Sequence, residues 1–146
     1  MNDAPAGPSV PALIVTHARL GAALLDAAGT ITGPVEGVAM LSNEGLSRDA
    51  LVAAVGERLA AFGTRGGIVF ADVAGGSCAQ AALTAAALVA PGPVRVLCGV
   101  NLPMLLDYLH NRTRLGPAAL ADHVLVRGRA SVQLLESPAT ESQGRT

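Results

Sequence analysis

The stretch ALIVTHARLG, residues 12–21, decides the fold because its pattern changes half-way along. Residues 12–16 form a continuous, mostly apolar run, as expected for a parallel strand that is buried on both faces. From Ala18 to about Gly29, apolar residues recur at helical spacing. His17 stands between the two patterns, at the carboxyl end of the predicted strand, where ligands collect in open α/β sheets. An imidazole carries a proton or a transferable group near neutral pH, so His17 is the first candidate functional residue.

The same alternation of strand and helix continues along the chain. It predicts strands at 12–16, 35–41, 68–71 and 94–100, and helices at 18–29, 48–62, 78–89, 102–109 and 117–135. Four strands that each precede a helix predict parallel pairing through right-handed crossovers. The expected fold class is therefore α/β, doubly wound, with a mainly parallel sheet of four strands and helices on both faces. Strand 35–41 contains Glu36 and Gly37 and is expected at a sheet edge.

Length and composition predict a single domain without a membrane segment. The chain has 146 residues, which is enough for one core, and we expect a flexible leader at 1–10, a folded domain at 11–136 and a disordered tail at 137–146. Mean hydropathy is +0.47, but apolar windows such as 81–90 are far shorter than the roughly 20 residues that span a bilayer. No basic residue precedes Arg19, so the start does not resemble a secretory signal. A cytoplasmic location is expected.

Charge and cysteine usage argue against several classes of function. The net charge is −1 and aromatic residues make up 2% of the chain, which disfavours nucleic-acid binding. The two cysteines have no zinc-like spacing, so the sequence predicts neither a disulfide framework nor a metal site. Neither a GxxxxGK[ST] pattern nor GxGxxG occurs, and we expect no nucleotide cofactor.

Polar residues follow three of the predicted strands and meet at one sheet edge. His17 follows the first strand, Asp72 the third, and Asn101 the fourth. If the first and third strands are neighbours, His17 and Asp72 face each other at the topological switch point. The aspartate would then fix the tautomer of the imidazole and leave the other nitrogen free as a nucleophile.

A glycine-rich turn precedes the helix that follows Asp72. Gly75, Gly76 and Ser77 would offer backbone N–H groups and a hydroxyl to an anion at a helix N-terminus. Nucleophile, orienting carboxylate and anion site together describe phosphoryl transfer through a phosphohistidine. The same residues also fit a tight turn with an N-cap, and Asp72 also fits a structural cap.

Three segments resemble the enzyme IIA component of the mannose family of the bacterial phosphoenolpyruvate:sugar phosphotransferase system. They are THARLG after the first strand, VFADVAGGS around the end of the third, and CGVNLPMLLDYL after the fourth. GVNLPML is the most specific of these, and the similarity extends over about residues 12–135. The resemblance implies that His17 takes phosphate from the phosphocarrier protein HPr and passes it to a IIB unit, here a separate chain. It also implies a homodimer and, in many members, an extra C-terminal edge strand from the partner subunit.

The chain departs from the family pattern around the predicted site. Ala18 replaces the usual glycine after the histidine, Val73 and Ala74 replace a threonine and a tryptophan, and Cys78 replaces a proline. These changes leave phosphate acceptance intact but affect the rim where a partner would dock. Two other functions stay open: a regulatory phosphorylation sensor without sugar transport, and the phosphotransfer subunit of a dihydroxyacetone kinase.

The remaining reactive residues have simpler interpretations. Cys78, near a helix start, is a weak candidate for redox chemistry, and Cys98 is expected to be a small buried side chain. His110 and His123 are expected at the surface without a carboxylate partner. Arg112 and Arg114 fit either a patch that meets a partner or a solvated connection between helices.

Overall fold

The computed structural model describes residues 7–139. Its strands are β1 (Ala12–Thr16), β2 (Val38–Ser42), β3 (Gly67–Ala71) and β4 (Val94–Cys98). Its helices are α1 (Leu20–Thr32), α2 (Arg48–Ala60), α3 (Ser77–Val89), α4 (Leu102–Asn111) and α5 (Pro117–Ala130). The α/β class and the alternation of strands and helices are as the sequence predicts.

The four strands form one parallel sheet in the order β2-β1-β3-β4. All residues of the two central strands, β1 and β3, are buried, which explains their uninterrupted apolar sequences. β2 lies at an edge, as predicted from Glu36 and Gly37. Because β1 pairs directly with β3, the chain reverses its direction of winding between them, and the ends of these two strands open onto the switch point.

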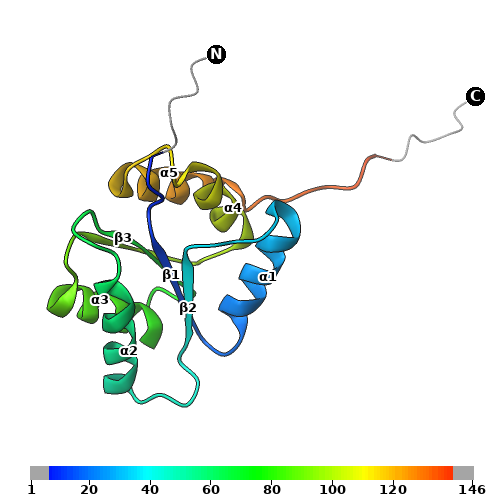
Figure 1. Cartoon of the computed structure of the whole chain (residues 1–146). Helices are drawn as coiled ribbons and strands as arrows, with labels where there is room; N and C mark the ends of the chain where they lie inside the picture. Colours follow the sequence, from blue (N-terminus) through cyan, green and yellow to red (C-terminus); the bar gives the residue numbers. More distant parts are fainter. Residues whose placement is uncertain (1–6, 140–146) are drawn as a thin grey trace, which may run out of the picture.

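Helices cover both faces of this sheet (Figure 1). α1, α4 and α5 pack on one face around Ile14, Phe70 and Tyr108, whereas α2 and α3 pack on the other around Leu13 and Val69. Successive residues of a strand point to opposite faces, so each central strand contributes to both clusters. The two cores fix β1 and β3 rigidly, and with them the residues that follow each strand.

Several predicted boundaries are wrong. α1 runs from Leu20 to Thr32 instead of 18–29, so its helix continues past Gly29, and the ends of α2 and α4 each differ from the prediction by two residues. Three other boundaries differ for a clear local reason. β2 starts at Val38 instead of 35 because Gly37 has φ of 76°, which interrupts the extended backbone. β4 ends at Cys98 instead of 100 because Gly99 has φ of 77°. α5 ends at Ala130 instead of 135, where the Ser131 hydroxyl donates to a carbonyl of the last turn.

The predicted leader is partly packed. Residues 1–6 lie outside the described part of the chain, but Val10 is buried, donates its N–H to the Arg112 carbonyl at 2.9 Å and accepts from the Tyr108 hydroxyl. A buried carbonyl needs such a partner, so these bonds fix the start of the fold before Pro11, earlier than predicted.

The far end of the chain adds no strand to the described sheet. Residues 132–139 form neither helix nor strand, and the rest of the predicted tail, 140–146, lies outside the described part. The optional C-terminal edge strand is therefore not formed within residues 132–139. Among the helices between residues 7 and 139, none is long and apolar enough to cross a membrane.

Candidate phosphoryl-transfer site

The imidazole of His17 is held by the carboxylate of Asp72. His17 directly follows β1 and Asp72 directly follows the neighbouring β3, so sheet pairing alone brings the two residues together. Oδ2 of Asp72 lies 2.8 Å from Nδ1 of His17 and also accepts the His17 backbone N–H at 2.9 Å. One carboxylate oxygen thus fixes both the backbone and the ring, and the other ring nitrogen, Nε2, faces away from it.

Asp72 is a carboxylate in this environment. Its side chain is only 8% exposed, and this burial would raise its pKa. Hydrogen bonds from the His17 backbone and ring outweigh the burial, so the pKa of Asp72 is lowered below its ordinary value. A carboxylate can only accept hydrogen bonds, so Nδ1 carries the proton and Nε2 keeps a lone pair. The His17 side chain is 44% exposed and open to a reactant.

The turn between β1 and α1 is held by a residue that the sequence did not single out. Ala18 has φ of 48°, which is strained for a residue with a Cβ by about 1 kcal/mol. Its N–H donates to Oδ1 of Asn43 at 3.2 Å, and the Asn43 N–H donates to the Thr16 carbonyl at 3.2 Å. Asn43 follows β2, the other neighbour of β1. The position of Asn43 directly after a strand parallel to β1 could have indicated that it lies near His17.

The predicted glycine turn lies against the imidazole. A Cβ on Gly76 would stand 3.1 Å from Cε1 of His17, so glycine permits this close approach. Gly76 is also the N-cap of α3, and the Ser77 hydroxyl lies 3.4 Å from Nε2. The positive end of the α3 dipole and its first N–H groups therefore border the free nitrogen, where they favour an anion.

A groove of about 300 Å³ adjoins this turn. The starts of α2 and α3 both line it, through Ser47 and Arg48 on one side and Gly75, Gly76 and Ser77 on the other. The Ser47 hydroxyl accepts from the Ala50 N–H as the N-cap of α2. Arg48 is exposed and is the one cationic side chain among the described residues that line the groove. Two helix N-termini and a guanidinium suit a phosphorylated reactant.

Asn101, the polar residue predicted to join this site from the end of β4, has its side chain engaged in a helix cap. The side chain of Asn101 accepts from the Met104 N–H and caps α4. Cys78, by contrast, is fully buried beside the imidazole, with Sγ 3.8 Å from Nδ1. Burial and the charge of Asp72 both raise the pKa of the Cys78 thiol, so a thiolate of depressed pKa, as redox chemistry would need, is not formed here.

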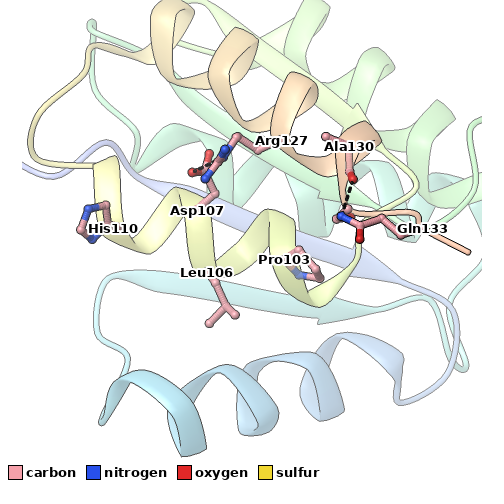
Figure 2. A pocket seen from close by; sticks show the side chains of 8 residues that line it. Pro103, Leu106, Asp107, His110, Arg127, Ala130 and Gln133 are labelled. Carbon is pink, nitrogen blue, oxygen red and sulfur yellow. Dashed lines mark hydrogen bonds and ion pairs between the residues drawn. The ribbon is translucent and has the colours of Figure 1, made fainter. Parts of the chain in front are cut away.

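A second His–carboxylate pair lies on α4 and α5, and its existence corrects the expectation for His123. Nδ1 of His123 lies 2.7 Å from Oδ2 of Asp107, a carboxylate that is 12% exposed. Both helices line a groove of about 480 Å³. Figure 2 shows Asp107 beside Arg127 in this groove, with His110 farther along α4. Asp107 and His123 both lie beyond the first turn of their helices, whereas the His17–Asp72 pair borders the start of α3.

The two arginines of the predicted connection have different environments. Arg112 lies over the Tyr108 ring, 5.9 Å from its centroid, and donates to the Glu36 carbonyl at 2.5 Å. It therefore ties the connection after α4 to the chain before β2, a structural role. Arg114 is exposed and lies 3.5 Å from Nε2 of His110.

A family model described as the fructose IIA component of the phosphotransferase system, EIIA-man, matches residues 12–125. The chain belongs to this IIA family. Its members are IIA components of sugar phosphotransferase systems, so family membership implies phosphotransferase activity. The predicted resemblance to the mannose-type IIA components is thereby confirmed.

Solved structures described as IIA components share the fold of this chain. A mannose/sorbose-specific IIA subunit from Enterococcus faecalis is 21% identical with a TM-score of 0.75, covering 91% of this chain and 99% of that one. An EIIA component from Streptococcus agalactiae is also 21% identical, with a TM-score of 0.77 and coverages of 85% and 95%. No curated protein sequence matches the chain.

Proposed function

We propose that this IIA chain is a phosphocarrier in which Nε2 of His17 accepts a phosphoryl group from phospho-HPr. The observation that carries the proposal is the 2.8 Å contact between Asp72 and Nδ1, which leaves the lone pair on the exposed Nε2. Nucleophilic attack forms the Nε2–phosphorus bond while the phosphorus–nitrogen bond to the donor breaks. The ring becomes positively charged, and the adjacent carboxylate stabilises that charge.

The surroundings of Nε2 suit the transferred group. Ser77 Oγ, 3.4 Å from Nε2, can donate to a phosphoryl oxygen, and the N–H groups that open α3 are directed to the same region. The phosphoryl group then passes to a separate IIB component in the reverse sense, with Nε2 as leaving group. The chemistry needs no metal or organic cofactor, and we place it in the cytoplasm.

The acceptor depends on the rim of the site. Val73, where the family usually has threonine, is 55% exposed and precedes the glycine turn. An exposed apolar residue at this point changes the surface offered to a partner, which favours the regulatory alternative as the second candidate. Transfer from phosphorylated protein to a mannose-type IIB, compared with retention of the label, separates the two functions.

One experiment tests phosphoryl acceptance itself. The chain is incubated with labelled phosphoenolpyruvate, enzyme I and HPr, and we expect one acid-labile, base-stable phosphate on the wild type and none on His17→Ala. His123→Ala is the matched control because His123 is also paired with an aspartate and similarly exposed. Absence of label on the wild type, or equal label on His17→Ala, would disprove the proposal.

We also propose that the chain forms a homodimer through its C-terminal segment. β4 is an edge strand of the described sheet, and three apolar residues after α5 are 81–87% exposed: Val132, Leu134 and Leu135. Such exposure is unfavourable in water, and an unpaired strand edge accepts a further strand. Light scattering should give the mass of a dimer for the full chain and of a monomer after truncation at Ser131. A monomeric full chain refutes this assembly without affecting the chemistry of His17.

A further inference from the structure

Three different metal-ligating groups meet on the buried side of the His17 ring. Nδ1 of His17, a carboxylate oxygen of Asp72 and Sγ of Cys78 all lie within 4.8 Å of one another. They come from the ends of two strands and the first turn of α3, so sequence spacing does not reveal them. Cys78 packs in the core between the sheet and α3 and takes no part in the phosphoryl transfer proposed above, and its Sγ lies 3.8 Å from Nδ1 of His17.

The donor set suits a zinc-like cation. Zn²⁺ binds cysteine sulfur, histidine nitrogen and carboxylate oxygen, at about 2.3 Å for sulfur and about 2.0–2.2 Å for the others. A tetrahedral ion with those bond lengths separates its ligand atoms by about 3.3–3.7 Å. Sγ and Nδ1 are 3.8 Å apart, and Nδ1 and Oδ2 are 2.8 Å apart. The Nδ1–Oδ2 pair would widen by about half an ångström and the Sγ–Nδ1 pair would shorten by less than that, while the third pair of ligand atoms lies within 4.8 Å.

We propose that His17, Asp72 and Cys78 bind a zinc-like divalent cation, and that this binding switches off phosphoryl acceptance. The three protein groups would leave the fourth position of a tetrahedral ion to a water molecule. The inhibition of phosphoryl acceptance rests on the proposed function of His17, whereas cation binding itself does not.

The inhibition follows from the two tautomers of one ring. A metal at Nδ1 needs the lone pair of that nitrogen, so the ring proton must lie on Nε2. Phosphoryl acceptance needs the opposite arrangement, with the proton on Nδ1 and the lone pair on Nε2. The cation thus removes the nucleophile without covering it, and a phosphorylated His17, with its proton on Nδ1, excludes the cation.

The proton balance of the binding step is defined. The Cys78 thiol gives its proton to solvent as the sulfur–metal bond forms, and the Nδ1 proton moves through solvent to Nε2. Asp72 exchanges a hydrogen bond for a bond to the metal. One proton is released per cation bound, and no redox partner is needed.

Cobalt titration of the metal-free protein tests the site directly, without phosphoryl transfer. Co²⁺ should bind one equivalent and give the near-ultraviolet charge-transfer band of a thiolate ligand. Cys78→Ser should lose the band and weaken binding by at least about tenfold, because even an outer-shell partner of a metal ligand is worth that much. Cys98→Ser is the matched control, since Cys98 is the other free cysteine and lies outside the ligand group. Cys78→Ala, with its fold checked by circular dichroism, must behave as Cys78→Ser does.

Phosphorylation assays with and without Zn²⁺ then separate this inference from the proposed function. With metal removed by a chelator, phosphate label on His17 tests the proposed phosphocarrier function alone. With Zn²⁺ at saturation, the wild type and Cys98→Ser should slow by about tenfold or more relative to their own rates in chelator, and Cys78→Ser by less than about twofold. A missing cobalt–thiolate band in a protein that is phosphorylated in chelator overturns the metal site and leaves the carrier. A band that persists in Cys78→Ser also overturns it.

Discussion

Substitution of Asp72 by asparagine should slow phosphoryl acceptance strongly while leaving the fold intact. Asparagine keeps the size of the side chain and an oxygen that can accept the His17 backbone N–H, now 2.9 Å from Oδ2. It removes the charge that stabilises the ring as phosphorus binds. The change tests whether Asp72 acts by charge or only by position.

The magnitude follows from the hydrogen bond that is changed. A bond to a charged group contributes about 1.5–3 kcal/mol and a neutral one about 1 kcal/mol. The difference of about 0.5–2 kcal/mol corresponds to about a 2- to 30-fold change in rate. The asparagine oxygen stays toward the ring, because the atom that contacts Nδ1 also accepts the His17 backbone N–H, which an NH₂ group cannot do. We therefore expect a decrease of about 2- to 30-fold.

The assay is the initial rate of label transfer from phospho-HPr in chelator, with folding checked by a urea titration. Asp107→Asn is the matched control, because Asp107 is equally close to a histidine, 2.7 Å from Nδ1 of His123, and also nearly buried. That variant should transfer phosphate at the wild-type rate. An Asp72→Asn protein that transfers at the wild-type rate, or an equal loss in both variants, refutes the reasoning.

Three further predictions concern the backbone and charge around the same ring. Ala18→Gly should relieve the positive φ of 48° and raise the free energy of unfolding in urea by about 0.5–1 kcal/mol; a decrease would show that the turn is not strained. Gly76→Ala should displace the His17 ring, 3.1 Å from the added Cβ, and slow phosphorylation, whereas Gly75→Ala, with open space around its Cβ, should not; equal rates would contradict this. The pKa of Asp72 is lower in the folded than in the unfolded chain, where it is about 3.9, so its ionisation stabilises the fold above that pH. This stabilisation is lost as the pH falls through the folded pKa, and the unfolding free energies of the wild type and Asp72→Asn should converge in acid. A difference that stays constant with pH would argue against this linkage.

The central strands were predictable because both of their faces are buried. The limits of β1 are as predicted and those of β3 differ by one residue, since continuous apolar runs bounded by polar residues leave little freedom. The edge strands were less predictable, because their limits depend on the positive φ of Gly37 and Gly99, and the residue type alone does not reveal which glycines adopt it.

Side-chain partners that come from different elements were harder to predict than strand order. The pairing of His17 with Asp72 follows from the adjacency of β1 and β3, which the sequence suggested. The contacts of His123 with Asp107 and of Asn43 with Ala18 depend on helix packing and on a loop conformation. The spacing of residues within one segment does not predict which side chains from other segments they contact.

The two nitrogens of the His17 ring have different environments, and this asymmetry gives them different roles. Nδ1 faces two buried groups, Asp72 and Cys78, whereas Nε2 faces Ser77, the α3 N-terminus and solvent. The nitrogens share one mobile proton in the neutral ring, so any ligand that takes the Nδ1 lone pair moves that proton to Nε2. The buried side therefore determines the reactivity of the exposed side. A cysteine at position 78 lets a soft cation act on that buried side, which an apolar residue at the same place would not allow.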